Sequence, residues 1–261
     1  MTRRFDMDRR AYLKTVGAVG ATAGVAGCLG DVLGGGDDTI IPGTAPGFAP
    51  FEFTNDDGEL VGFDIDLAEE TIDRAGYEVG DWTEIEFESL IPELTEENID
   101  LAAAGMTITE ERQETIAFSE PYYESDQAVL VASDGDLDPG SVEDLEGAVV
   151  GAQTGTTGEG EVETLVEDGI VAEDDTRQYQ NYPMAVQDLE NGNVDAIIID
   201  IPVAQNFESG RDVEVAFEIE TGEVFGFGMR QDDDRIGDIN DALAEIRDDG
   251  TYEDLIETWF E

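Results

Sequence analysis

Apolar and polar residues follow two different periods along this chain, and together they predict both helices and strands. Within residues 62–76, apolar side chains recur at spacings of three and four, which is typical of a helix with one buried face. Residues 83–88 (TEIEFE) alternate, with Ile85 and Phe87 on one face, as in a half-buried strand. Residues 99–105 (IDLAAAG) form a short apolar run suited to a buried parallel strand. The alternation of such segments predicts an α/β fold.

One of these patterns occurs twice. Residues 97–105 and residues 192–200 share the order Asn, apolar residue, Asp, apolar run, and each run ends at unusual polar residues. The first leads to Gly105, Thr107 and Arg112, and the second ends at Asp200. Because ligands bind beyond the carboxyl ends of strands in open α/β sheets, the two strand ends predict a cleft between them.

Charge narrows the classes of function. The chain has 65 acidic and 12 basic residues, and its first 27 residues hold two of the acids and five of the bases. From Cys28 onward there are therefore 63 acids, seven arginines and no lysine. We interpret this composition as an adaptation to concentrated salt, which screens self-repulsion. A surface so poor in cations argues against nucleic acid as a partner.

The N-terminus predicts export and anchoring. A twin arginine (Arg9 and Arg10) precedes an apolar stretch too short to span a bilayer, and VAGC ends it at Cys28, the only cysteine. This arrangement resembles a twin-arginine signal with a lipoprotein box, which implies cleavage after residue 27 and a lipid on Cys28. Residues 28–37 then form a Gly- and Asp-rich linker. The mature protein is expected on the extracellular face of the cytoplasmic membrane.

Arg112 is the first candidate for chemistry, since arginine is so scarce here. Thr109 is expected to cap a short helix, which places Arg112 near its third position, where a cation opposes the helix dipole. Local helix stability therefore does not explain it. Its guanidinium could pair with a nearby acid such as Glu114 or Glu120, or it could bind the carboxylate of a ligand.

Several blocks of sequence favour the ligand. GFAPFEF, GFDIDLAEE, AGMTITEER, FSEPYY, VGAQTGTTG, VDAIIIDIPVA and IRDDGTYEDLIETWF occur in this order over residues 40–261. Together they resemble the family 3 extracellular solute-binding proteins, which are receptors of polar amino-acid ABC importers. The resemblance implies a type II periplasmic-binding-protein fold, with two mixed sheets flanked by helices. Lobe 1 would comprise residues 38–121 plus 226–261 and lobe 2 residues 127–220, joined by hinge crossovers at 122–126 and 221–225.

The same resemblance implies the roles of individual residues. Arg112 would hold the α-carboxylate of the ligand, with Thr107 and the backbone N–H of Thr157. Asp200 would take the α-ammonium group, with the Gly105 carbonyl and the Thr107 hydroxyl. The resemblance also implies three residues that would contact the side chain of the ligand: Phe48, Phe87 and Gln153. The two phenylalanine rings would enclose it. Without the resemblance, phenylalanines would more often belong to the core.

One position departs from the family pattern. Where glutamine and basic amino-acid receptors carry an aspartate that reaches the ligand's side chain, this sequence has Ala45. An amino acid with a neutral or polar side chain is therefore expected. The other expected partners are the permease subunits of the importer and the lipid anchor, with no cofactor and no bound metal, and the receptor is expected to act as a monomer.

Enzyme classes are restricted by the residues themselves. The chain has no histidine, which excludes histidine-based triads and metal ligands, and TGTTGEG lacks the lysine of a P-loop. Acids at spacing two from Asp134 resemble a calcium loop, but Pro139 and Leu145 break the pattern. A few relatives of the expected fold are lyases, so a cyclohexadienyl-type dehydratase is the enzymatic alternative. A sensory amino-acid receptor is the other.

Overall fold

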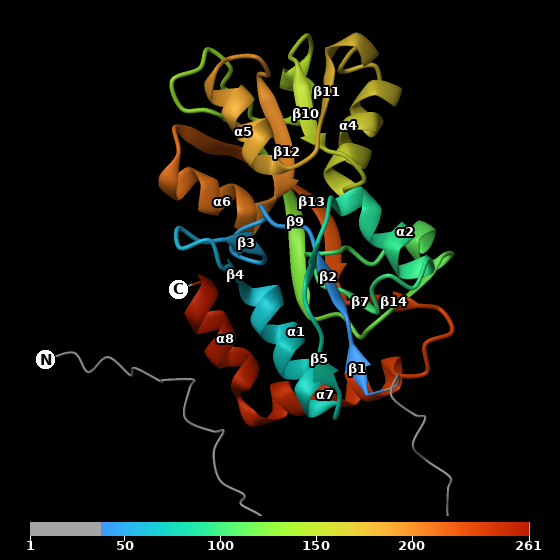
Figure 1. Cartoon of the computed structure of the whole chain (residues 1–261). Helices are drawn as coiled ribbons and strands as arrows, with labels where there is room; N and C mark the ends of the chain where they lie inside the picture. Colours follow the sequence, from blue (N-terminus) through green and yellow to red (C-terminus); the bar gives the residue numbers. More distant parts are fainter. Residues whose placement is uncertain (1–37, 261) are drawn as a thin grey trace, which may run out of the picture. The chain divides into compact units, whose positions relative to one another are not determined.

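The computed structural model describes residues 38–260, and all structural statements concern this part of the chain. The predicted signal, Cys28 and the linker lie outside it. Two five-stranded mixed sheets dominate the fold, as expected from the resemblance (Figure 1). The first has the order β6-β2-β7-β14-β8 and the second β11-β10-β12-β9-β13. The strands of the first sheet are β6 Thr83–Glu84, β2 Pro42–Thr44, β7 Leu101–Ala102, β14 Gly228–Arg230 and β8 Ile116–Phe118.

The second sheet has longer strands. They are β11 Thr176–Tyr179, β10 Val150–Gln153, β12 Ala196–Asp200, β9 Tyr123–Ala132 and β13 Val213–Phe225. Two small sheets complete the strands: β1 Thr39–Ile40 pairs in parallel with β5 Glu78–Val79, and β3 Phe53–Thr54 pairs antiparallel with β4 Leu60–Val61.

The sequence repeat corresponds to the middle strand of each large sheet. β7 runs parallel to β2 and antiparallel to β14. β12 likewise runs parallel to β10 and antiparallel to β9. Both strands are buried along their whole length, which explains why they read as apolar runs rather than as an alternation. Their polar ends are therefore held at the carboxyl edge of the two most enclosed strands.

Helices cover both faces of each sheet. The predicted helix of residues 62–76 is α1 Phe63–Arg74, and its apolar stripe is buried against α7 and α8. On the other face of the first sheet, α2 packs through Leu90 and Leu94 against β7, β8 and β14. In the second sheet, α4 covers one face and α5 and α6 the other. The remaining helices have these bounds: α2 Leu90–Thr95, α3 Glu110–Gln113, α4 Thr157–Glu167, α5 Tyr182–Glu190, α6 Ile201–Gly210, α7 Ile236–Asp249 and α8 Thr251–Phe260.

The strand predicted at residues 83–88 is only partly correct. β6 covers Thr83–Glu84, and Phe87 begins a short 3-10 helix, Phe87–Ser89, which leads directly into α2. Two further 3-10 turns occupy Val142–Leu145 and Glu173–Asp175. The alternation in TEIEFE placed Ile85 and Phe87 on one side, and both do pack against the hydrophobic cluster that contains Leu90 and Leu94, although Phe87 lies in a helical turn rather than in a strand.

The two segments expected to be hinge crossovers lie side by side. β9 begins at Tyr123 and β13 ends at Phe225, and these two residues are antiparallel partners. The pairing register shifts between Ile219 and Glu223. At this irregularity Asp126 Oδ1 accepts the N–H groups of Thr221, at 2.9 Å, and Gly222, at 2.7 Å. A side chain from one segment thus satisfies backbone groups of the other.

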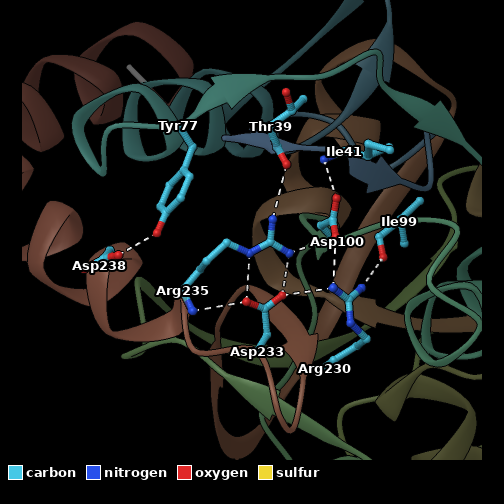
Figure 2. A network of polar contacts seen from close by, with 9 residues as sticks. All are labelled: Thr39, Ile41, Tyr77, Ile99, Asp100, Arg230, Asp233, Arg235 and Asp238. Carbon is cyan, nitrogen blue, oxygen red and sulfur yellow. Dashed lines mark hydrogen bonds and ion pairs between the residues drawn. The ribbon is translucent and has the colours of Figure 1, made fainter. Parts of the chain in front are cut away.

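A network of ion pairs joins distant segments of the first sheet (Figure 2). Arg230 and Arg235 both bond to Asp100, which precedes β7, and both bond to Asp233. Asp100 also accepts the Ile41 N–H at 2.9 Å, and Arg235 reaches the Thr39 carbonyl at 3.2 Å. The network therefore ties the loop before α7 to the start of the described chain and to the central strand. Between residues 38 and 260, no helix combines the length and apolar character needed to cross a bilayer.

Candidate functional site

Arg112 is positioned by a turn that the sequence predicts correctly. After β7 the chain passes Thr107, which forms a bridge with Phe225, and enters α3. Thr109 caps α3, since its Oγ1 accepts the backbone N–H of Arg112 at 3.2 Å. Arg112 is accordingly the third residue of the helix.

The Arg112 side chain is held by carbonyl groups. Its Nη1 donates to the Thr107 carbonyl at 2.7 Å and its Nη2 to the Gly155 carbonyl at 2.9 Å, while its guanidinium carbon lies 5.3 Å from the centre of the Phe87 ring. It makes no ion pair with any described residue, so the alternative pairing with Glu114 or Glu120 is not observed. Burial lowers the pKa of Arg112 despite the opposing effect of nearby carboxylates. The guanidinium is positioned, yet its charge is not paired.

Asp200 is the second ionisable group of the predicted site, and one of its carboxyl oxygens lacks a described partner. It is the last residue of β12, immediately before α6, and its side chain is buried. Its Oδ1 has no hydrogen-bond partner among the described residues. Burial, reinforced by the negative charge of Glu223, raises the pKa of Asp200 to about 8. A cation placed beside it would stabilise the ionised form.

A glycine-rich turn carries the next pair of predicted residues. Gln153 ends β10, and α4 begins at Thr157. Thr156 caps α4, because its Oγ1 accepts the Glu159 N–H at 3.2 Å. The N–H of Thr157 belongs to the first turn of the helix, where it has no partner within the helix and where anions are favoured.

Gly105 and Phe48 are in close contact. Gly105 has a φ of +53°, and a Cβ atom added there would lie 2.6 Å from the Phe48 ring. Its N–H donates to Asp64 at 2.7 Å, which fixes the turn that follows β7. Phe48 is buried and packs against Phe51 and Tyr182, with ring centres 5.7 Å away in both cases. Only glycine fits this backbone conformation at this approach.

All eight residues predicted for the ligand line one narrow cavity. About 300 Å³ of empty space lies between its lining atoms, but only about 10 Å³ admits the centre of a water-sized sphere. A small molecule could enter only if the walls moved apart. The full lining is Ala45, Phe48, Glu52, Phe87, Ala104, Gly105, Thr107, Arg112, Gln153, Thr156, Thr157 and Asp200. A larger, open groove, with about 1480 Å³ of empty space between its lining atoms, lies elsewhere and contains none of the eight.

The sequence analysis missed three acids at or next to this cavity. Glu52 is buried and lines it, and its Oε2 has no described partner. Burial, together with the charges of Asp64 and Asp200, raises the pKa of Glu52 well above its ordinary value. Burial also raises the pKa of Asp64 to about 6. Glu223, in the segment expected to be the second crossover, accepts hydrogen bonds from Thr107 and Thr157. Among 63 acids, nothing in residue type or spacing distinguishes these three.

The chemistry of the cavity follows from this inventory. One guanidinium lies among several carboxyl groups, with one buried acceptor free on Asp200 and another on Glu52. Such a surface is complementary to a ligand that carries one carboxylate and several N–H donors. Leaving the guanidinium or a buried carboxyl oxygen without a partner costs free energy.

Comparison with known proteins gives the same family throughout. The sequence profile described as "Bacterial extracellular solute-binding proteins, family 3" matches residues 40–261. The chain is 37% identical over 232 residues to the histidine-binding periplasmic protein of Escherichia coli (strain K12), covering 84% of this chain and 86% of that protein.

Solved structures agree with the sequence matches. An ancestral arginine-binding protein bound to arginine superposes with a TM-score of 0.80 at 38% identity, covering 86% of this chain and 99% of that one. An ancestral amino acid-binding protein, described as a precursor of cyclohexadienyl dehydratase, gives a TM-score of 0.76 at 32% identity, covering 86% and 96%. The expected arrangement of two mixed sheets flanked by helices, as in type II periplasmic binding proteins, is confirmed.

Proposed function

Because the chain belongs to the family 3 bacterial extracellular solute-binding proteins, we propose that it is the receptor of an ABC importer and binds an amino acid in the cavity described above. It would deliver this amino acid to the permease subunits in the membrane. In this proposal Arg112 holds the α-carboxylate together with the Thr157 N–H. Asp200 holds the α-ammonium group together with Gly105 and Thr107.

The observation that carries the proposal is the unpaired charge of Arg112. A guanidinium fixed by two carbonyls and a ring, with no described carboxylate as ion-pair partner, is costly unless an anion completes the site. The free Oδ1 of Asp200 lines the same cavity. An α-amino acid supplies both missing charges within one small molecule.

Hinge closure is the proposed route into the cavity, since its present free space is too small for an amino acid. We propose lobes at residues 38–121 plus 226–261 and at 127–220, which turn about the crossovers 122–126 and 221–225. The register shift in β13 supports a hinge there, because an irregular pairing can change more easily than a regular ladder. Closure is expected to reduce the radius of gyration measured by small-angle X-ray scattering when the amino acid is added. An unchanged radius would contradict this part of the proposal.

The class of side chain is proposed from the charge around the cavity. Once Arg112 and Asp200 are paired with the ligand's backbone groups, Glu52 remains as a buried acid with a free acceptor. A cationic side chain would pair with it, in agreement with the histidine-binding and arginine-binding relatives described above. Ala45 argues against a cationic ligand, because it favours a neutral or polar side chain.

Calorimetric titration in concentrated salt separates these two classes. The panel would contain L-arginine, L-lysine, L-histidine, L-glutamine and L-leucine. The proposal predicts binding of at least one cationic member with a Kd well below about 1 mM, corresponding to ~−4 kcal/mol. Tighter binding of glutamine or leucine would favour the class expected from Ala45. No binding by any amino acid would contradict the receptor function.

A binding function is favoured over catalysis by the relatives themselves. The histidine-binding and arginine-binding proteins above are described as binders, and the neighbour related to the dehydratase is itself described as amino acid-binding. A transport role, rather than a sensory one, is tested by uptake of labelled amino acid in cells with and without this gene. We expect uptake to fall in its absence, with the receptor behaving as a monomer in light scattering.

Export and anchoring are proposed from the N-terminal sequence. We propose a twin-arginine signal over residues 1–27 and a lipid on Cys28, since the arginine pair, the short apolar stretch and the VAGC box agree. Cys28→Ser should release the exported protein into the medium. Replacing Arg9 and Arg10 with lysine should leave it inside the cell. Retention of the Cys28→Ser protein on membranes would contradict lipid anchoring.

A high-salt habitat is proposed from composition. With 63 acids against seven arginines after residue 27, self-repulsion is large in dilute buffer and small at about 1 M salt, where the Debye length is ~3 Å. The unfolding midpoint should therefore rise as salt increases to molar concentrations. A midpoint that stays constant between dilute and molar salt would contradict this interpretation.

A further inference from the structure

Glu223 makes contacts that give it a more specific role than that of one more acid near the cavity. It lies near the end of β13, within the proposed second crossover. Its Oε2 accepts hydrogen bonds from the Thr107 hydroxyl and from the Thr157 hydroxyl, both at 2.7 Å. Its Oε1 accepts from Gln127 Nε2 at 3.2 Å. The two threonines line the cavity, one after the central strand of the first sheet and one at the start of α4.

Counting hydrogens determines which way the two hydroxyls point. A threonine hydroxyl has one hydrogen, and each of these two is donated to Glu223 Oε2. The two hydroxyl oxygens lie 3.4 Å apart, with no hydrogen left to share between them. Gln127 Nε2 also donates to Thr157 Oγ1 at 3.3 Å, so this hydroxyl accepts one hydrogen while it donates its own. With Glu223 ionised, the hydroxyls have only lone pairs to offer the cavity.

We propose that Glu223 is a positioning residue that makes the Thr107 and Thr157 hydroxyls obligatory acceptors and thereby selects a ligand with an ammonium group. This inference rests on the proposed function. Together with the free Oδ1 of Asp200 and the Gly105 carbonyl, the hydroxyls give the cavity at least as many acceptors as the three hydrogens of an ammonium group.

The direction of the two hydroxyls also gives the α-carboxylate and the α-ammonium group of the ligand different partners. By resemblance, Thr107 could serve either the α-carboxylate or the α-ammonium group. An oxygen that has already donated its hydrogen repels a carboxylate, because neither partner has a hydrogen to offer. The α-carboxylate is therefore left to Arg112 and to the backbone N–H of Thr157, which are donors only. Glu223 needs no contact with the ligand to have this effect.

The test compares ligands with and without the α-ammonium group. Glu223→Gln keeps the shape but brings in an amide that can donate to the hydroxyls, which would let them turn toward the cavity. The matched control is Glu220→Gln, an exposed residue of the same strand. The ligand is whichever of L-arginine, L-lysine or L-histidine binds the wild type most tightly. Its partner is the same compound without the α-amino group: 5-guanidinopentanoate, 6-aminohexanoate or imidazolepropionate.

Calorimetry should show a selective loss. Glu223→Gln is expected to weaken binding of the amino acid by about 10-fold or more, as for loss of a hydrogen bond to a charged group. The affinity for the deaminated compound should change by about 2-fold or less. Glu220→Gln should change neither. Equal weakening of both compounds would indicate a merely structural role, and tighter binding by Glu223→Gln would indicate competition with the ligand's carboxylate; either result overturns the inference without affecting the proposed function. Wild-type protein that binds no amino acid overturns both.

A second measurement needs neither ligand nor variant. Neutron diffraction from deuterated wild-type crystals locates the hydroxyl deuterons of Thr107 and Thr157 directly. The inference predicts that both lie on the line to Glu223 Oε2. Deuterons that point toward the cavity would overturn it.

Discussion

Asp100 provides a sharp test of how a protein with so few cations uses them. Its carboxylate accepts three hydrogen bonds: from the Ile41 N–H at 2.9 Å, from Arg230 at 3.0 Å and from Arg235 at 2.8 Å (Figure 2). The Asp100 side chain is 18% exposed and those of the two arginines 19% and 17%. The perturbation is Asp100→Asn, which preserves size but removes the charge shared by two of the seven arginines.

The magnitude follows from this intermediate burial. Exposed ion pairs contribute about 0–1 kcal/mol, and breaking a buried pair costs roughly 3–5 kcal/mol. Because both arginines keep Asp233 as a partner, we expect Asp100→Asn to lower the free energy of unfolding by about 2–3 kcal/mol. For a domain of this size that corresponds to a fall in Tm of about 4–12 °C.

The assay is denaturant or thermal unfolding in molar salt, with Glu190→Gln as the matched control. Among the described residues Glu190 has one ion-pair partner, Arg211, and this pair is more exposed, at 24% and 33%. Salt screens exposed pairs more than half-buried ones, so the control should cost less than about 1 kcal/mol. If Asp100→Asn costs no more than Glu190→Gln, the reasoning from burial and shared partners is wrong.

The dependence of this effect on pH has a defined sign. Burial alone would raise the pKa of Asp100, but the bonds from Ile41, Arg235 and Arg230 lower it below its ordinary value. A carboxyl group with a lowered pKa in the folded state contributes stability above its unfolded pKa, and this contribution is lost as pH falls through the folded pKa. The difference between wild type and Asp100→Asn should therefore shrink below about pH 4.

Two further predictions concern the cavity. Gly105→Ala should destabilise the protein by about 1–3 kcal/mol and weaken ligand binding, because the new Cβ would combine a φ of +53° with a contact of 2.6 Å to Phe48. The control in the same unfolding and titration assays is Gly76→Ala, which has a positive φ but open space around the new Cβ. Equal losses of stability in the two variants would refute the steric argument. Affinity should rise with pH up to about 8, by at most about tenfold per unit, since a bound ammonium group favours ionised Asp200, whose pKa burial raises to about 8. In Asp200→Asn the remaining affinity should not show this rise, and an identical pH profile would assign the effect to another group.

The sequence predicted the framework of the site because that framework depends on local rules. The cap at Thr109 and the third helical position of Arg112 both follow from capping preferences. The repeated apolar runs predicted two buried strands with polar ends, and these two strands are the middle strands of the two large sheets. Resemblance then supplied a set of eight residues, which the structure brings to one cavity, although their roles toward a ligand stay predictions.

The parts that could not be predicted depend on tertiary contacts. Glu52 and Glu223 differ from other acids only by burial and by the hydroxyls and carboxyls around them, which no spacing in an acid-rich chain reveals. Phe87 fits a strand by alternation, but the helical turn that packs it beside Leu90 prevails over that pattern. The shared network of Asp100 and Asp233 likewise joins segments more than 100 residues apart.

The central claim is that Arg112 binds the carboxylate of an amino acid in this cavity. The most direct measurement is calorimetric titration of the wild type and of Arg112→Ala with the tightest-binding member of the amino-acid panel, in molar salt, after unfolding curves have shown that both are folded. We predict a Kd well below about 1 mM for the wild type and a loss of about 100-fold or more in Arg112→Ala, as expected when a buried charge-assisted bond is removed. An Arg112→Ala protein that binds as tightly as the wild type would contradict the claim.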